Sequence, residues 1–236
     1  MVSAEVVERI SLPFKTLFPG QAAIAASTAK RKVWRAGRRG GKTVGAANMD
    51  AEEFLSGKRV LYAAPTGEQT DAYWYEVKRI LQPAIDAGVY IKNETERFIE
   101  LSGTKQRLKA KTAWNADTFR GDFADKLTLD EYQLMAEDVW EVVAQPMLLD
   151  NNGDVLFIYT PPSMASRGIS KARDPRHAAK LFQKALSDKT GYWAAFHYTS
   201  YDNPYLSQEA FAILMVDMSQ ESIRKEIMAE DEVLSP

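Results

Sequence analysis

Residues 36 to 43 read Ala36-Gly37-Arg38-Arg39-Gly40-Gly41-Lys42-Thr43, and this glycine-rich loop decides the fold. Glycines let the backbone curl until consecutive N–H groups point at phosphate oxygens, while a lysine reaches the outer phosphates and a hydroxyl ligates magnesium. Lys42 and Thr43 occupy the last two places. Ala36 stands where the usual pattern has its first glycine, although Gly37 follows it. We therefore predict that residues 37–43 bind the phosphates of ATP and that Thr43 ligates Mg²⁺.

An expected strand, Lys32–Ala36, precedes this loop, and an expected helix, Thr43–Leu55, follows it. The helix adds the positive end of its dipole to the anion site. A basic surface turn is the alternative interpretation of the loop, and the flanking strand and helix count against it. Lys32 and Arg35 are unexpected in this strand, because buried parallel strands are usually continuous apolar runs.

Short apolar segments alternate with helical segments along the chain, which is typical of a mostly parallel α/β sheet. The expected strands are Lys32–Ala36, Val60–Ala64, Lys126–Leu129 and Val155–Tyr159, and the expected helices are Thr43–Leu55, Glu68–Asp86 and Ala136–Leu149. Ser102-Gly103 lies between two β-rich runs, which predicts an antiparallel hairpin within Arg97–Lys111. We predict a P-loop NTPase fold of the RecA-like (ASCE) type, with helices flanking the sheet and ligands bound at its carboxyl edge.

The chain is expected to divide after Pro162. Residues 1–162 form the expected P-loop ATPase core, and residues 163–236 form a small lid or linker subdomain packed on it. Turn-forming and charged residues dominate up to about Lys189, and an expected strand, Tyr192–Thr199, follows. The turn Tyr201-Asp202-Asn203-Pro204 then leads to an amphipathic helix near Gln208–Met228.

The composition is that of an average globular protein and excludes several kinds of site. The chain has 236 residues, 45% hydrophobic and 26% charged, which is enough to bury a core without disulfides. It has no cysteine and 2 histidines, which excludes thiol nucleophiles and thiolate or histidine-rich metal sites. Because the net charge is −2, contact with nucleic acid needs a local basic patch or another part of a larger assembly.

Paired carboxylates end the mostly apolar strand Leu127-Thr128-Leu129-Asp130-Glu131. In P-loop NTPases an aspartate at a strand end holds the magnesium shell, and an adjacent glutamate can polarise the water that attacks the γ-phosphate. A solvated strand end is the alternative interpretation, and the upstream P-loop favours the functional one. Glu131 also distinguishes two classes of enzyme, because an ATP hydrolase needs a water-activating carboxylate at this position and a nucleotide kinase does not.

A second polar strand end is Ile158-Tyr159-Thr160-Pro161-Pro162. The hydroxyl of Thr160 is a candidate sensor of the γ-phosphate, and the two prolines stiffen the exit of the strand. A plain end of the strand is an equally good interpretation of these residues taken alone.

The order of these motifs resembles the ATPase domain of phage terminase large subunits, the motors that package DNA into viral capsids. The likeness extends from about Phe18 to Glu230. Motifs more specific than the P-loop are Ala64-Pro65-Thr66 followed by Gln69, Phe119-Arg120-Gly121, the Asp-Glu strand with Tyr132 after it, Thr160-Pro161-Pro162 and Tyr201-Asp202-Asn203-Pro204.

The resemblance implies a role for each matching residue. Gln21 matches the glutamine that recognises adenine, and Arg38 matches an arginine of the P-loop that contacts phosphate. Asp130 and Glu131 match the magnesium aspartate and the catalytic glutamate. Thr160 matches the coupling motif that links hydrolysis to motion.

The resemblance also implies an arginine finger. Arg120 matches an arginine proposed to reach the ATP of a neighbouring subunit. An ordinary surface arginine is an equally good interpretation of Arg120, and Arg38, acting in cis, is then the better candidate for the finger.

The partners that the resemblance implies are double-stranded DNA, a homo-oligomeric ring on the capsid portal and the small terminase subunit. Met1–Ile10 lacks the basic start and apolar run of a signal peptide, and no apolar stretch approaches the roughly 20 residues that span a bilayer. We therefore expect no membrane partner and a place in the host cytoplasm, transiently on the procapsid.

Terminase large subunits continue into a nuclease domain, whereas this sequence stops at Pro236, shortly after Glu230-Asp231-Glu232. We expect a piece of a longer chain or a separate ATPase subunit, without nuclease activity in these residues. The predicted function is ATP hydrolysis that powers translocation of viral DNA into a procapsid. The alternatives are a helicase-like or DNA-repair ATPase and a non-catalytic nucleotide-binding assembly protein, which would keep Lys42 but not need Glu131.

Overall fold

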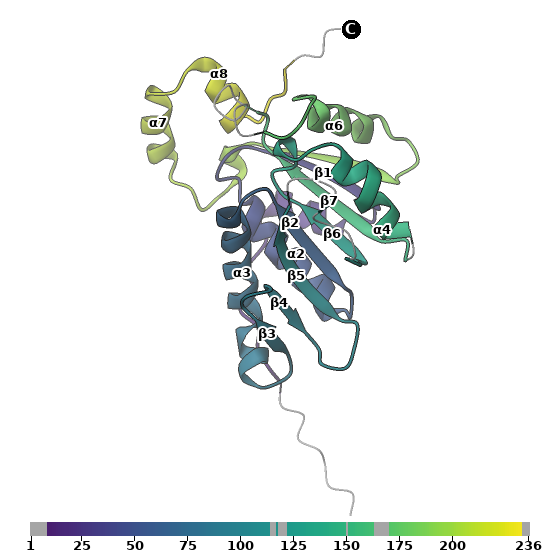
Figure 1. Cartoon of the computed structure of the whole chain (residues 1–236). Coiled ribbons are helices and arrows are strands. Elements are labelled where there is room, and N and C mark those ends of the chain that lie inside the picture. Colours follow the sequence, from purple (N-terminus) through teal and green to yellow (C-terminus); the bar gives the residue numbers. More distant parts are fainter. Residues whose placement is uncertain (1–8, 114–116, 118–121, 150, 163–169, 233–236) are drawn as a thin grey trace, which may run out of the picture.

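The computed structural model describes residues 9–113, 117, 122–149, 151–162 and 170–232. An eight-stranded sheet with the order β3-β4-β5-β2-β6-β7-β1-β8 runs through it (Figure 1). The strands are β1 (Arg31–Ala36), β2 (Val60–Ala64), β3 (Ile91–Asn93), β4 (Phe98–Glu100), β5 (Arg107–Thr112), β6 (Lys126–Leu129), β7 (Asp154–Tyr159) and β8 (Trp193–Tyr198). Neighbours from β5 to β8 in this order pair in parallel, whereas β4 is antiparallel to both β3 and β5. The predicted mostly parallel sheet is confirmed.

Helices cover both faces of this sheet. The α-helices are α1 (Pro19–Ala26), α2 (Lys42–Leu55), α3 (Gly67–Asp86), α4 (Gln145–Leu149), α6 (His177–Ser187), α7 (Gln208–Val216) and α8 (Gln220–Ser222). The 3₁₀ segments are Tyr132–Leu134 and Ser200–Asp202, and the π-helical segments are Val139–Ala144 and Ile223–Ile227. The pair α2 and α3 packs against β2 and β5, whereas α6 packs against β1 and β8 at the other end of the sheet (Figure 1).

Successive residues of a strand point to opposite faces of the sheet and belong to two different apolar clusters. Trp34 and Tyr62 belong to the apolar cluster under α2 and α3, whereas their neighbours Val33 and Leu61 belong to the cluster that contains residues of α4 and α6. Side chains alternate across a strand, so a strand covered on both faces must be apolar at nearly every position. This is why the central strands could be located from the sequence.

In β1, Lys32 and Arg35, the cations that were unexpected in this strand, each have a partner. Lys32 donates from Nζ to the carbonyl of Ile24 at 3.1 Å, and burial lowers the pKa of this lysine to about 8. Arg35 donates from Nη1 to Oδ2 of Asp231 at 2.7 Å and lies over the ring of Phe182. The positive charges inside this strand are therefore explained by contacts with other segments of the chain.

Two elements differ from the sequence analysis. The predicted hairpin is present as β4 and β5, but the short strand β3, which we did not predict, extends it by pairing with β4. The prediction of one helix near Gln208–Met228 is wrong, because α7 ends at Val216 and a new helix starts at Gln220. The side chain of Ser219 accepts a hydrogen bond from the N–H of Ser222, which caps the new start.

The segment after residue 162 contributes to the main sheet. Strand β8 pairs with β1 along its whole length, and α6 packs on both strands. Helices α7 and α8 follow β8 in the chain and lie outside the sheet, at the upper left of Figure 1. The division into a core of residues 1–162 and a subdomain of residues 163–236 stays a prediction. Among the described residues, every helix is too short or too polar to cross a bilayer.

Candidate nucleotide site

The P-loop connects β1 to α2 and is packed too tightly for larger residues. A Cβ atom on Gly37 would lie 2.3 Å from the carbonyl oxygen of Ile227 and 2.4 Å from Oγ of Ser200. Gly41 has a φ of 74°, a left-handed conformation that glycine adopts without strain. Ala36 is the last residue of β1 and is buried in the sheet. In this loop the first required glycine is therefore Gly37.

Lys42 and Thr160 meet at the carboxyl edge of the sheet. The ammonium group of Lys42 donates to the hydroxyl of Thr160 at 2.7 Å and to the carbonyl of Gly37 at 3.1 Å. The Thr160 hydroxyl in turn donates to the carbonyl of Ala36 at 2.9 Å, which joins the end of β7 to the end of β1. The two residues predicted to contact the outer phosphates are thus in direct contact.

Asp130 lies beside Thr43, as expected for a pair that holds magnesium. Oγ1 of Thr43 lies 3.4 Å from Oδ2 of Asp130, and the same carboxylate oxygen accepts a hydrogen bond from the hydroxyl of Tyr62 at 2.8 Å. Burial raises the pKa of Asp130 to about 6, with a further contribution from the carboxylate of Glu131 and opposition from Lys42.

The neighbouring carboxylates have separate partners. Oδ1 of Asp130 accepts the backbone N–H of Glu131, whereas Oε2 of Glu131 accepts a hydrogen bond from the side chain of Gln133 at 2.6 Å. Glu131 has a φ of 52°, a left-handed conformation that costs a non-glycine residue about 1–3 kcal/mol. Such strain is common at active sites, and here it turns the chain directly after the end of β6.

The residues present fit ATP with Mg²⁺. Magnesium is usually bound by one or two protein oxygens together with phosphates and water, not by an all-protein cage. Thr43 and Asp130 supply such a set, and the described residues contain no cluster of three or more histidine, aspartate or glutamate side chains that would form a cage.

The C-terminal segment holds the P-loop from the other side. The N–H of Arg38 donates to the carbonyl of Glu226 at 2.6 Å, and the two side chains form an ion pair at 3.2 Å. Ser200 donates to the carbonyl of Arg38, and Asn203 donates to the carbonyl of Arg39 at 2.7 Å. Sequence reasoning missed Ser200 and Glu226, and the turn containing Asn203 was the available signal.

Gln21 is buried against the P-loop. Its Nε2 donates to the carbonyl of Gly41 at 2.9 Å, and its Oε1 accepts the N–H of Phe18 at 3.3 Å. It also lines a pocket of about 410 Å³ together with Phe18, Asn203 and Tyr205. One donor and one acceptor position of the Gln21 amide remain available to a nucleotide base. Recognition of adenine by Gln21 stays a prediction, whereas its hydrogen bond to the P-loop is present in the structure.

We expect Gln21→Ala to lower the preference for ATP over GTP. The substitution should also weaken binding of both nucleotides about three- to tenfold, because the loop loses a hydrogen bond. Competition of ATP and GTP with a fluorescent nucleotide measures both effects. An unchanged ATP/GTP ratio would remove Gln21 from base recognition.

Of two further motifs, one lies outside the described residues and the other caps a helix. Phe119-Arg120-Gly121 lies outside the described residues, so the finger role of Arg120 stays a prediction. Thr66 and Gln69 form a reciprocal cap at the start of α3, in which each side chain accepts a hydrogen bond from the backbone N–H of the other.

This fold and this site define a P-loop NTPase. No protein-family model matches the sequence. In an alignment 162 residues long, which covers 61% of the chain, the sequence is 28% identical to the terminase large subunit of Thermus virus P23-45. The chain covers 33% of the length of that relative.

Solved structures of phage large terminases share the fold. The large terminase ATPase domain of Thermus phage P74-26 superposes with a TM-score of 0.71, 22% identity and coverage of 91% of this chain and 94% of that one. The large terminase of a thermophilic bacteriophage in complex with ATP-γ-S superposes with a TM-score of 0.64 and 16% identity over 91% of this chain and 53% of that one. The chain therefore resembles the ATPase domain of phage large terminases in sequence and in fold.

Proposed function

We propose that this chain is the ATPase part of a phage DNA-packaging motor and that it hydrolyses ATP with Mg²⁺ to move double-stranded DNA. The observation that carries the proposal is the meeting of Lys42, Thr160, Thr43 and Asp130 at the carboxyl edge of the sheet. The resemblance to phage large terminases supports the choice of motor. A homo-oligomeric ring, a portal and a small terminase subunit belong to the same proposal.

The chain's own residues divide the chemistry among them. Lys42 and the N–H groups of the P-loop would bind the phosphates, and Thr43 and Asp130 would hold the metal. Mg²⁺, when bound, would supply positive charge that offsets the negative charge developing during transfer. Glu131 accepts a proton from the attacking water or orients it, and Gln133 fixes the carboxylate of Glu131 through a hydrogen bond.

Phosphate release, measured as a function of protein concentration with and without linear double-stranded DNA, tests the proposal. The motor predicts turnover that rises with protein concentration and with DNA, without separation of the strands. Separation of the two DNA strands would favour a helicase-like enzyme. The described β-strands of this chain form one sheet. Absence of turnover at high protein concentration would favour a non-catalytic nucleotide-binding protein and would contradict the proposal.

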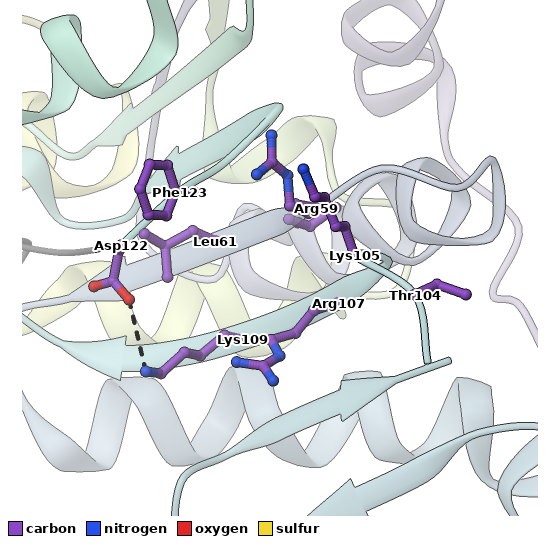
Figure 2. Close-up of a pocket in the computed structure, with 9 residues that line it drawn as sticks. Arg59, Leu61, Thr104, Lys105, Arg107, Lys109, Asp122 and Phe123 are labelled. Carbon is purple, nitrogen blue, oxygen red and sulfur yellow. Dashed lines mark ion pairs between the residues drawn. The ribbon is translucent and has the colours of Figure 1, made fainter. Parts of the chain in front are cut away.

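A local basic surface supports the DNA part of the proposal. A hollow of about 420 Å³ is lined by four cationic side chains, Arg59, Lys105, Arg107 and Lys109, and by the acidic Asp122 (Figure 2). Positive charge gathers here although the whole chain has a net charge of −2. Lys109 forms an ion pair with Asp122 at 3.6 Å, Arg59 pairs with Asp125 and Arg107 with Glu100, so acidic residues offset part of the charge.

The hollow lies on one face of β5. Arg107 and Lys109 alternate along this strand with Leu108 and Ala110, which are buried under α2 and α3 on the opposite face. Lys105 is exposed in the turn that joins β4 to β5. Cations that neutralise DNA phosphates release counterions, so their contribution depends strongly on salt. We propose that this surface faces the DNA backbone.

We expect Lys105→Glu to weaken binding of duplex DNA at low salt and to reduce the slope of log K against log [salt] by about one. Fluorescence anisotropy of a labelled duplex across a salt series measures this slope. Lys189→Glu is the matched control, because Lys189 is exposed in the turn after α6 and the change of net charge is the same. Equal effects of the two variants would mean that total charge, not this surface, determines binding.

A further inference from the structure

A buried tyrosine lies directly behind the aspartate of the nucleotide site. Tyr62 on β2 and Asp130 after β6 are both almost fully buried, with exposed fractions of 0% and 2%. The Tyr62 hydroxyl donates to Oδ2 of Asp130 at 2.8 Å. This is the carboxylate oxygen that lies 3.4 Å from Oγ1 of Thr43. Tyr62 therefore contacts Asp130, one of the two residues proposed to hold magnesium, and is itself fully buried.

A second tyrosine holds the first in place. The rings of Tyr62 and Tyr73 are stacked, with centroids 3.5 Å apart and planes inclined by 5°. The hydroxyl of Tyr73 donates to Oδ2 of the buried Asp50 at 2.9 Å, and Thr128 donates to Oδ1 of Asp50 at 2.9 Å. These bonds connect α2, α3 and β6 beside the stacked rings, whereas the stacking itself fixes the plane of the Tyr62 ring and does not depend on the Tyr73 hydroxyl.

The aspartate is thereby fixed at both oxygens. The N–H of Glu131 donates to Oδ1 at 2.9 Å while Tyr62 donates to Oδ2, so rotation of the carboxylate would break at least one of these bonds. Magnesium requires near-ideal octahedral geometry and is therefore sensitive to the orientation of the oxygens around it. Loss of a hydrogen bond that orients a metal-binding side chain typically lowers metal affinity 10- to 100-fold.

We infer that Tyr62 is a positioning residue for Asp130 and determines how strongly the P-loop site couples nucleotide binding to Mg²⁺. The inference rests on the proposed function, because it presumes that this site binds ATP with the metal. Tyr62 acts through Asp130 and does not touch the phosphates. In the sequence alone, Tyr62 cannot be distinguished from the other residues of a buried strand.

Tyr62→Phe tests the inference, because it removes the hydroxyl and keeps the stacked ring. Binding of a fluorescent ATP analogue is titrated with Mg²⁺, and its affinity is also measured in EDTA. We expect the Mg²⁺ concentration at half-maximal effect to rise about 10- to 100-fold, with the affinity in EDTA unchanged. A general disturbance of the fold would instead lower the affinity in both conditions.

Tyr73→Phe is the matched control. It also deletes a hydroxyl that donates to a buried carboxylate, from the other ring of the same stacked pair, but that carboxylate is Asp50 and not Asp130. We expect thermal unfolding to show a similar loss of stability for the two variants and the Mg²⁺ midpoint to move for Tyr62→Phe alone. An unchanged midpoint for Tyr62→Phe, or equal shifts for both variants, would overturn the inference.

A double-mutant cycle with Asp130→Asn gives a second measurement. If Tyr62 acts through the carboxylate, Tyr62→Phe should not move the Mg²⁺ midpoint further once Asp130 is Asn. Additive shifts would overturn the inference. Failure of the wild-type chain to show any Mg²⁺-dependent nucleotide binding would contradict the proposed function instead, so the two failures are distinguishable.

Discussion

Glu131→Gln is expected to retain ATP binding and to lower turnover at least about a hundredfold, the usual range for loss of a general base. The amide has nearly the shape of the carboxylate but cannot take a proton from the attacking water. Lys42, Thr43 and Asp130 are untouched, so the nucleotide and the metal keep their partners. Phosphate release and binding of a fluorescent ATP analogue, measured on the same preparation, separate the two effects.

Two further variants make this result specific. Lys42→Ala should weaken nucleotide binding itself, because Lys42 supplies the cation for the outer phosphates. Glu96→Gln, in the turn between β3 and β4 at the far edge of the sheet, makes the same chemical change away from the site and should leave both activities unchanged. Turnover of Glu131→Gln near the wild-type rate would show that Glu131 is not the catalytic base.

The central strands could be predicted because each is buried on both faces. Val60–Ala64 and Lys126–Leu129 coincide with β2 and β6, since few polar residues are tolerated where helices cover both sides of a sheet. The strand β3 was missed because it has three residues at the edge of the sheet, too few for a periodic pattern. The break before Ser219 was missed because a side-chain cap overrides the apolar pattern on both sides of it.

The residues of the candidate phosphate site could be picked out of the sequence for a different reason. Its residues are contiguous in the loop or stand at the ends of strands, so local sequence carries the signal. Tyr62 and Glu226 carry none, because each acts on a residue far along the chain, Asp130 and Arg38 respectively. Only the fold brings these pairs together.

The largest effect on ATPase activity is expected from the arginine finger. Of its two candidates, Arg38 and Arg120, only Arg38 lies among the described residues. The backbone of Arg38 is bonded at its N–H to Glu226 and at its carbonyl to Ser200, and its side chain pairs with Glu226 at 3.2 Å. The backbone and side chain of Arg38 are thus held by contacts within its own chain, and we propose that Arg38 acts on the nucleotide bound there. A finger that acts in trans must come from another residue, and the resemblance to terminases implies Arg120.

We expect a mixture of Arg120→Ala and Glu131→Gln proteins, each inactive alone, to regain ATPase activity. An arginine supplied across an interface typically accelerates phosphoryl transfer by roughly 10³–10⁵, so even a minority of correctly paired interfaces is detectable. In a mixed ring some interfaces combine the intact Arg120 of one subunit with the intact Glu131 of the next. Phosphate release is measured at concentrations where light scattering shows that the proteins associate.

The control exploits the different position of Arg38. Arg38→Ala mixed with Glu131→Gln should show no rescue, because a residue that acts in cis is missing from every subunit that retains Glu131. Rescue in the Arg120 mixture and none in the Arg38 mixture assigns the finger to the neighbouring subunit. No rescue with Arg120→Ala, despite association of the proteins, would contradict the trans assignment and leave Arg38 as the finger, which would then have to exchange its ion pair with Glu226 for the phosphate.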